Sequence, residues 1–454
     1  MGMDWLWSRT KGSLSLALCS SALCLGACVE QGEADEGEAS ETGAESGTQT
    51  GTEGEPETDT STDADEGEGE GEGEADSSEG ETEGGEALSC WYIAEAGHGP
   101  AKLALGPSGQ LFSLATRDDL GSLRVVEHGP GGEALWVAEY ADALGASVEG
   151  SDVAVDDAGR IYITGQVSGQ DEDSDALLLA YSNIGELLWS QRFGAGASGA
   201  RGLRVDAEGN AYVTGFASGA FEGEDHEGGT DSFVAKFSAA GEQLWLVEFG
   251  NAYDDRGEAL DVHETGVYVA ARQNLAAVDD EGFAKSRIML VKLTLAGAIS
   301  WTRVFNESGQ MWWPRDLIIH PEGVVSVAGS YTIPSDEPEG DTTGAIVAGY
   351  DLTGHAEWLE YISSPGVVSG GALGLGADGN IYYAAQVLDI GGGALGPDIL
   401  LVALTAAGAV AGSVTRDYGL DDYTQDIAVG SGDAELYLSG GYSGWGFVTQ
   451  YCPA

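Results

Sequence analysis

The sequence predicts an all-β fold in which seven four-stranded units close into a β-propeller, preceded by a disordered acidic segment. A turn glycine recurs at intervals of 50, 50, 57, 57 and 56 residues, at Gly109, Gly159, Gly209, Gly266, Gly323 and Gly379. A second glycine precedes a tryptophan by four residues in the pairs Gly132/Trp136, Gly185/Trp189, Gly241/Trp245, Gly297/Trp301 and Gly354/Trp358. Repeats of this length are typical of propellers, whose ring leaves only short strand edges.

Each unit has four segments in which apolar residues alternate, the pattern of a pleated strand. In the third unit these segments are Gly202–Val205, Asn210–Phe216, Ser232–Ser238 and Gln243–Phe249. The sequences between them are typical of turns, because they place glycine where a positive φ is needed. A degenerate seventh copy surrounds residues 434–440.

The second and third units carry a resemblance to a known repeat. The run from Asp231 to Trp245, following Gly209–Gly215, resembles the bacterial SBBP-type β-propeller repeat. The resemblance covers residues 90–452. It implies a seven-bladed propeller and says little about activity.

The two ends of the repeat region complete each other. Residues 447–451 match a third strand that no fourth strand follows, and the segment from Cys90 matches a fourth strand that no third strand precedes. We therefore expect strands from both termini to close the last blade. On this alignment Cys90 and Cys452 flank a hairpin turn, where opposed residues lie ~4.5–5.5 Å apart. We predict a disulfide between them, with two free thiols as the alternative.

The first 27 residues are interpreted as an export signal, with Arg9 and Lys11 before an apolar stretch too short to span a bilayer. The stretch ends in Leu25-Gly26-Ala27-Cys28, which resembles the lipobox of bacterial lipoproteins. The resemblance implies palmitate-type acylation of Cys28, stable membrane anchoring and a place in the cell envelope, at the surface of the outer membrane. The alternatives are an ordinary cleaved signal or a coincidental cysteine.

Residues 28–88 form the predicted tether, and residues 89–454 the propeller domain. The segment 29–88 holds 23 Asp and Glu and no Lys or Arg. Such a composition cannot bury enough apolar surface to offset its ordering entropy, so we expect disorder. The net charge of −58 excludes nucleic acid as a natural partner.

One face of the propeller is the candidate ligand surface. The second-to-third and fourth-to-first loops vary in length and emerge on the same side of an up-and-down blade. Its candidate ligand residues are Tyr253, Asp254, Arg256, Trp312, Trp313, Arg315, Tyr418 and Tyr423, with Asp255, Asp421 and Asp422 beside them. Aromatic residues beside carboxylates and arginine suit a carbohydrate or peptide. The alternative is solvated loops with an aromatic side chain packed between blades.

The sequence contains no catalytic motif, neither a nucleophile elbow nor a P-loop. The six histidines have no zinc-ligand spacing, and we expect neither metal nor cofactor. A weak calcium candidate, residues 171–175, departs from the EF-hand spacing.

We therefore predict a monomeric, non-enzymatic binding, adhesion or scaffold module for an extracellular carbohydrate or protein. One alternative is an extracellular hydrolase or lyase acting in the central cleft. A second alternative is a structural envelope protein without a small ligand.

Overall fold

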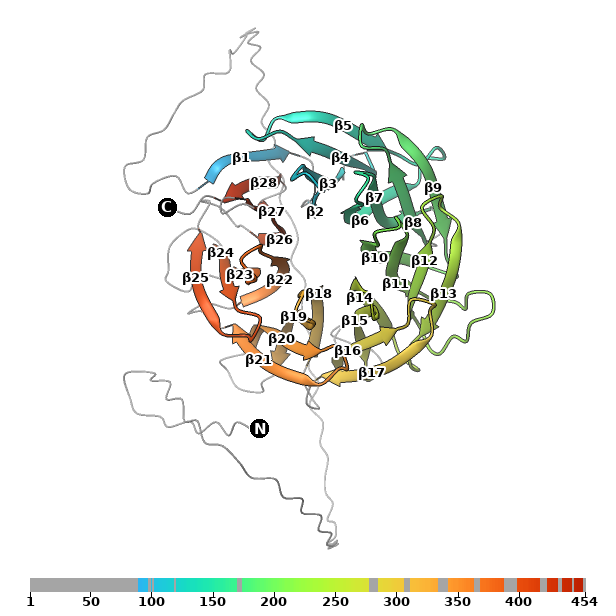
Figure 1. Cartoon of the computed structure of the whole chain (residues 1–454). Helices are drawn as coiled ribbons and strands as arrows, with labels where there is room; N and C mark the ends of the chain where they lie inside the picture. Colours follow the sequence, from blue (N-terminus) through green and yellow to red (C-terminus); the bar gives the residue numbers. More distant parts are fainter. Residues whose placement is uncertain are drawn as a thin grey trace, which may run out of the picture. The chain divides into compact units, whose positions relative to one another are not determined.

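The computed structural model contains seven four-stranded antiparallel sheets arranged as the blades of a ring (Figure 1). The chain divides into two units, 1–80 and 81–454, and the described residues belong to the second. The structure describes residues 89–451 apart from 97–98, 100–101, 118–119, 170–173, 277–284, 306–310, 334–341, 363–367, 388–397, 417–422, 432–434 and 443–444. Among the described residues, no helix is long and apolar enough to cross a membrane.

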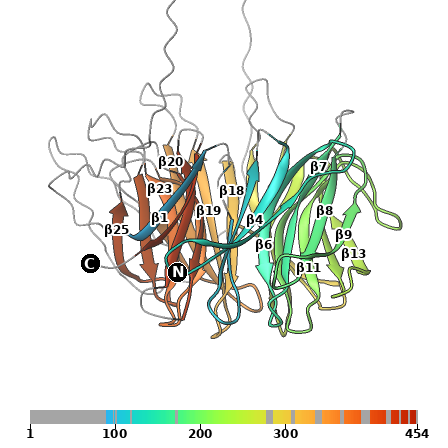
Figure 2. The same ribbon diagram turned by 90° about the horizontal axis from the view of Figure 1, so that it is seen from above.

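Six blades are each built from four consecutive strands, with the first strand innermost (Figures 1 and 2). Blade 1 contains β2 (Lys102–Leu105), β3 (Leu111–Arg117), β4 (Ser122–His128) and β5 (Ala134–Tyr140). Blade 2 contains β6 (Ser147–Val155), β7 (Ile161–Ser168), β8 (Ser174–Tyr181) and β9 (Leu187–Phe193). Blade 3 contains β10 (Ser198–Val205), β11 (Ala211–Ala217), β12 (Asp231–Phe237) and β13 (Gln243–Phe249).

The remaining blades follow the same plan. Blade 4 contains β14 (Asp255–His263), β15 (Gly266–Asn274), β16 (Ser286–Leu293) and β17 (Ile299–Phe305). Blade 5 contains β18 (Met311–Ile319), β19 (Val324–Ile333), β20 (Thr342–Asp351) and β21 (Ala356–Ile362). Blade 6 contains β22 (Val368–Leu375), β23 (Ile381–Val387), β24 (Asp398–Leu404) and β25 (Val410–Arg416).

The closing blade joins the two ends of the repeat region, as the sequence predicts. It contains β26 (Tyr423–Val429), β27 (Leu436–Tyr442), β28 (Trp445–Tyr451) and β1 (Ser89–Ala96). Strand β1 pairs with β28 in antiparallel register, with Ser89 opposite Tyr451. The side chain of Cys90 and the whole of Cys452 lie outside the described residues, so the disulfide between them stays a prediction.

The recurrent glycine and tryptophan form contacts between neighbouring blades. Gly241, in the β12–β13 turn of blade 3, has a φ of +83°, and a β-carbon there would lie 2.9 Å from the Trp189 ring of blade 2. The Trp189 indole Nε1 donates a hydrogen bond to the Ala239 carbonyl in the same turn (3.1 Å). Trp91 of the closing blade covers Gly132 of blade 1 in the same way. The repeated pair therefore stabilises blade junctions, including one at the ring closure.

The hydrophobic core lies largely between blades. One cluster, for example, joins Leu114 and Val125 of blade 1 to Val153, Ile163 and Leu179 of blade 2. Burial of apolar surface against a neighbouring blade is the main stabilising contribution in such a ring. The innermost strands β2, β6, β10, β14, β18, β22 and β26 are thereby held around the central axis (Figure 1).

Candidate functional site

A cavity of about 270 Å³ lies among the innermost strands, and charged side chains line it. The β-strand register shifts at equivalent points of several inner strands, between Ala200 and Gly202, between Gly257 and Ala259, and between Pro314 and Asp316. A β-bulge changes the direction of the side chains around it. The bulged residues Arg201, Glu258 and Arg315 all line the cavity.

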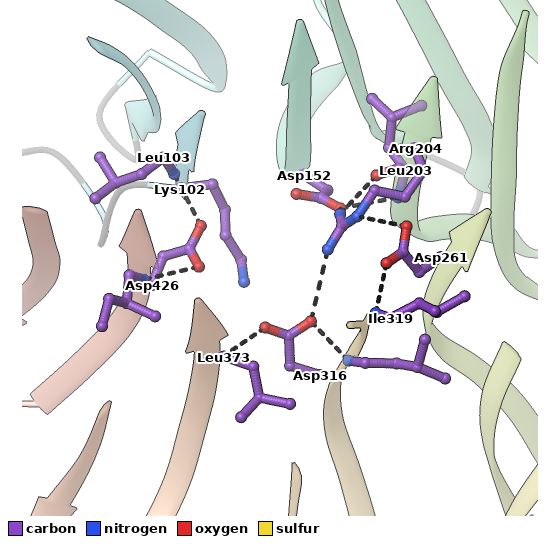
Figure 3. Close-up of polar contacts among 12 residues, drawn as sticks. Lys102, Leu103, Asp152, Leu203, Arg204, Asp261, Asp316, Ile319, Leu373 and Asp426 are labelled. Atoms are coloured by element: carbon purple, nitrogen blue, oxygen red, sulfur yellow. Dashed lines mark hydrogen bonds and ion pairs between the residues drawn. The ribbon is translucent and has the colours of Figure 1, made fainter. Parts of the chain in front are cut away.

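Deeper in the channel, acidic and basic side chains from several blades face one another (Figure 3). Arg204 Nη1 lies 3.3 Å from Asp152, and other nitrogens of its guanidinium lie 3.8 Å from Asp261 and 3.8 Å from Asp316. Lys102 and Asp426 line the opposite side of the same cavity.

Each of the four channel aspartates links two neighbouring blades through backbone amides (Figure 3). Asp152 Oδ1 accepts a hydrogen bond from the Val153 amide (2.9 Å), and its Oδ2 accepts one from the Leu203 amide of the next blade (2.8 Å). The other three aspartates make the same inter-blade bond at 2.8 Å, in the pairs Asp426/Leu103, Asp316/Leu373 and Asp261/Ile319. One oxygen of each carboxylate thus holds the neighbouring blade, and the other accepts a hydrogen bond from the amide of the following residue on its own strand.

The buried position of these groups changes their protonation. Burial raises the pKa of Asp316 to about 6, against the opposing effect of the Arg204 guanidinium. Burial also raises the pKa values of Asp152 and Asp261. For Lys102, burial acts to lower the pKa, but Asp426, Asp152 and Asp316 outweigh it and raise the value. The channel lysine therefore stays charged.

Four arginines from three adjacent blades face the same side chain, Glu258, at the cavity, and we call them the arginine cluster: Arg201, Arg256, Arg272 and Arg315. Arg256 on β14 and Arg272 on β15 are direct cross-strand partners. The guanidinium of Arg256 lies 4.5 Å from the centre of the Phe216 ring, and that of Arg201 lies 5.5 Å from it. Like charges in directly opposed positions destabilise a sheet.

Two nitrogens of this cluster have unused hydrogen-bonding capacity. The Nε atoms of Arg256 and Arg272 are buried and make no hydrogen bond. Arg315, which is exposed, donates only a long bond from Nε to Ser330 Oγ (3.3 Å) among the described contacts. These guanidinium groups can therefore still bind an anion, since arginine presents five donors in a rigid fork.

Glu258 is an acidic side chain that all four arginines of the cluster face. Burial raises its pKa, whereas Arg201, Arg272, Arg256 and Arg315 all act to lower it. Burial and the neighbouring Arg272 lower the pKa of Arg256, against the opposing effects of Glu258 and Asp254. Among the described residues, four arginines thus face these two carboxylates, which leaves a local excess of positive charge in a chain whose net charge is −58.

The predicted ligand residues differ in how far the structure exposes them to solvent. Tyr253 is 40% exposed in the β13–β14 loop, and Asp254 beside it accepts a hydrogen bond from Thr230 Oγ1 (2.9 Å). Because Thr230 ends the β11–β12 loop, this contact brings the two kinds of variable loop together on one face. Tyr423 is exposed at the start of β26, and Trp313 is partly buried. Arg256 and Arg315 join the arginine cluster.

Trp312 does not present its side chain to solvent. It is 3% exposed and packs edge-to-face on Phe305 of blade 4, with ring centres 5.2 Å apart. For this residue, packing between blades is the correct interpretation. Tyr418, Cys28 and residues 171–173 of the calcium candidate lie outside the described residues, and Asp175 of that candidate forms an ion pair with Arg192 (3.1 Å).

Sequence reasoning missed Arg201, Arg272, Glu258 and the channel aspartates. The aspartates do have a sequence signal, because an Asp followed by three consecutive apolar residues opens equivalent stretches at Asp152, Asp316 and Asp426. Arg201 and Glu258 have no comparable signal, because their direction depends on the bulge.

Comparisons with known proteins agree with the observed fold. The model of the SBBP β-propeller repeat matches residues 135–168, from β5 into β7. A regulatory protein of Caulobacter vibrioides, FlaEY, is 30% identical over 197 residues, which are 41% of this chain and 19% of that protein. The chain therefore spans about a fifth of this curated relative.

Among solved structures, the WD40 domain of Neurospora crassa Pan2 aligns with a TM-score of 0.50 at 9% identity, covering 81% of this chain and 95% of that one. Chaetomium thermophilum Raptor aligns with a TM-score of 0.50 at 10% identity, covering 81% of this chain and 29% of that one. At such identities the likeness extends to the fold alone. The chain is a seven-bladed β-propeller in which residues 135–168 match the SBBP β-propeller repeat.

Proposed function

We propose that this chain is a non-enzymatic binding module of the cell envelope. Its arginine cluster would bind the carboxylate groups of an extracellular acidic carbohydrate. The observation that carries this proposal is the convergence of four arginines, two of them with buried, unpartnered Nε atoms. Bidentate arginine–carboxylate pairs are strong and geometrically specific.

A purely structural role for these arginines fits the surroundings poorly. Acidic residues outnumber basic ones by 76 to 18 in the chain, so carboxylates are available to pair with every arginine. Arg256 and Arg272 instead face each other. Such an arrangement costs stability in the free protein and favours the binding of an anion that relieves the repulsion.

The deeper channel favours binding over catalysis. A glycoside hydrolase of the usual kind needs a carboxyl group that is free to exchange a proton with the substrate. The channel aspartates, including Asp316 with its raised pKa, hold two backbone amides each. Both oxygens of each of these carboxylates are therefore already occupied by hydrogen bonds to the chain.

The envelope location rests on sequence alone. Acylation at Cys28 would anchor the chain, and the acidic segment 29–88 would extend from the membrane. A flexible chain of this length has a root-mean-square span on the order of 40 Å, and charge repulsion lengthens it. The propeller would then stand clear of the membrane with its arginine cluster accessible.

The test is a calorimetric titration of the soluble 89–454 fragment with oligogalacturonate, an acidic carbohydrate, and with maltoheptaose, a neutral one. We expect binding of the acidic sugar only, weakened by salt. The double variant Arg256→Gln/Arg272→Gln should lose at least about tenfold in affinity, the value of one charge-assisted bond. The matched control is Arg192→Gln, because Arg192 lies outside the cluster and is already paired with Asp142 and Asp175. This variant should bind the acidic sugar as the wild type does.

Three outcomes would contradict the proposal. Binding of a glutamate-rich peptide but no sugar would make the ligand a protein. Cleavage of the oligosaccharide during the titration would favour the hydrolase or lyase alternative. Equal binding by the double variant would exclude the arginine cluster as the site.

A further inference from the structure

A second group of ionisable side chains lies in blade 3, where the β11–β12 loop meets the β13–β14 loop. One potential donor atom from each of His226, Asp231 and Glu248 lies within 4.8 Å of the other two. The Nδ1 atom of His226 is 2.6 Å from Oε1 of Glu248 and 3.3 Å from Oδ2 of Asp231. These residues come from three separate segments of the blade.

Two carboxylate oxygens at this place have no hydrogen-bond partner. They are Oδ1 of Asp231, a residue that is 1% exposed, and Oδ2 of Asp255, a residue that is 0% exposed. Both point to the same spot beside Gly250, because a β-carbon there would collide with the Asp231 oxygen and lie 3.1 Å from the Asp255 oxygen. The Nε2 atom of His226 is also buried without a partner.

Blade 2 shows what the same positions do when they are purely structural. The strand registers make Asp175 equivalent to Asp231 and Arg192 equivalent to Glu248. In blade 2 the arginine neutralises the aspartate at 3.1 Å, and a serine, Ser198, occupies the position of Asp255. Blade 3 therefore replaces an ion pair by two carboxylates beside one histidine, and a third carboxylate, Asp255 at the start of blade 4, faces Asp231.

Three buried carboxylates beside a single imidazole are unfavourable without a further cation or proton. Burial raises the pKa of Asp255 to about 7, although the Asn274 amide acts to lower it. Burial also raises the pKa of Asp231, against the hydrogen bond from the Glu227 amide. A divalent cation would satisfy the facing oxygens and compensate this charge.

We propose that the junction of blades 3 and 4 binds a divalent transition-metal ion of the Zn²⁺ or Mn²⁺ type, with Asp231 as the central ligand and His226, Glu248 and Asp255 completing the donor set. An imidazole nitrogen beside carboxylate oxygens suits these ions better than Ca²⁺, which prefers oxygen alone. Ligand atoms on one such ion lie about 3–4 Å apart. The donors therefore need only small side-chain adjustments.

The bound ion would stiffen the face that carries the arginine cluster. The Asp255 amide donates to the Thr230 carbonyl at 2.7 Å, so the ion would fix the β11–β12 loop against the start of β14. Arg256 directly follows Asp255 on that strand. The metal site is independent of the ligand proposed above, since it uses none of the four arginines.

The experiment is metal analysis of the full chain after dialysis against EDTA and then against Zn²⁺, Mn²⁺ or Ca²⁺, followed by calorimetric titration. We expect one tightly bound equivalent of Zn²⁺ or Mn²⁺ and a higher Tm in its presence. His226→Ala and Asp231→Asn should each weaken binding at least about tenfold. Asp175→Asn, the equivalent position in blade 2, is the matched control and should leave binding unchanged. The acidic segment 29–88 is the same in every variant, so any weak binding of metal ions to it does not affect the comparison between variants.

A second measurement guards against variants that fail to fold. Co²⁺ bound to the wild-type chain should give the visible absorption of a site with a nitrogen ligand, and Zn²⁺ should displace it. The proposal is overturned if no tightly bound equivalent is found, or if Asp231→Asn binds as the wild type does. Tight binding of Ca²⁺ alone, unaffected by His226→Ala, would overturn the donor set.

Discussion

Asp152→Ala removes one of the four inter-blade links in the channel while leaving the hydrophobic core untouched. The substitution leaves the Leu203 amide of blade 3 and the Val153 amide of blade 2 without their acceptors. It also removes one ion-pair partner of Arg204, whose guanidinium keeps two other aspartates nearby.

The expected cost follows from these contacts. Each buried amide that loses its acceptor costs about 1–3 kcal/mol. The cost is partly offset because burial already disfavours the Asp152 carboxylate and raises its pKa. We therefore expect a loss of about 2–4 kcal/mol in the free energy of unfolding. Asp152→Asn keeps one acceptor oxygen and should lose about half as much.

The assay is urea unfolding of the 89–454 fragment, followed by tryptophan fluorescence and circular dichroism. Coincidence of the two signals tests whether unfolding is two-state. The control is Asp175→Ala, since Asp175 and Arg192 form a partly exposed ion pair that contributes at most ~1 kcal/mol. If Asp152→Ala unfolds at the same urea concentration as the wild type, the channel aspartates do not hold the blades together.

The remaining predictions concern pH, the disulfide and the anchor. The pKa values in the folded state are about 6 for Asp316 and about 7 for Asp255, both above the ordinary value of 3.8. Between about pH 4 and 7 the folded state therefore binds more protons than the unfolded state, and the free energy of unfolding should fall as pH rises through this range. A higher urea midpoint at pH 8 than at pH 5, measured in EDTA, would contradict this. A Cys90–Cys452 bridge closes a loop of several hundred residues and should stabilise the fold by roughly 4–5 kcal/mol. Intact-mass analysis of the fragment should therefore find two hydrogens fewer before reduction than after it. A fully reduced fragment would exclude the bridge. Cys28→Ala should move the protein from the membrane fraction to the soluble fraction, and continued sedimentation with membranes would exclude lipid anchoring at this residue.

The fold could be predicted because the same contacts recur in successive blades and require the same residues at regular spacings in the sequence. The Gly241/Trp245 pair recurs because each tryptophan covers a turn glycine of the following blade, as Trp245 covers Gly297. The closing blade could be predicted because its two incomplete halves match known strands of the other units. The register of β1 with β28 confirms this arrangement.

The candidate sites were predicted only in part, because spatial convergence leaves no pattern along the chain. Arg256 and Arg315 were visible as charged residues at loop ends. Arg201 and Glu258 enter the channel through bulges, which the sequence does not mark. His226, Asp231 and Glu248 span 22 residues on separate segments, so a search for metal-ligand spacing among histidines misses them.

Trp312 is a residue that the sequence placed among the ligand candidates although its side chain is buried. Its place in a variable loop, residues 306–314, put it among the candidate ligand residues, but the neighbouring Phe305 and Tyr331 enclose it. A large aromatic side chain gains more by burial between blades than by exposure at a loop end.

We propose a division of the channel charges into aspartates that hold the blades together and arginines that bind a ligand. It is tested most directly by the urea midpoint of Arg256→Gln/Arg272→Gln without any ligand. The substitutions relieve like-charge repulsion, and against this they lose a stacking contact with Phe216 and part of the positive charge around Glu258. Because Arg201 and Arg315 still face Glu258, we expect a free energy of unfolding within about 1 kcal/mol of the wild type. A loss as large as that predicted for Asp152→Ala would contradict the claim and make the arginines part of the structural framework.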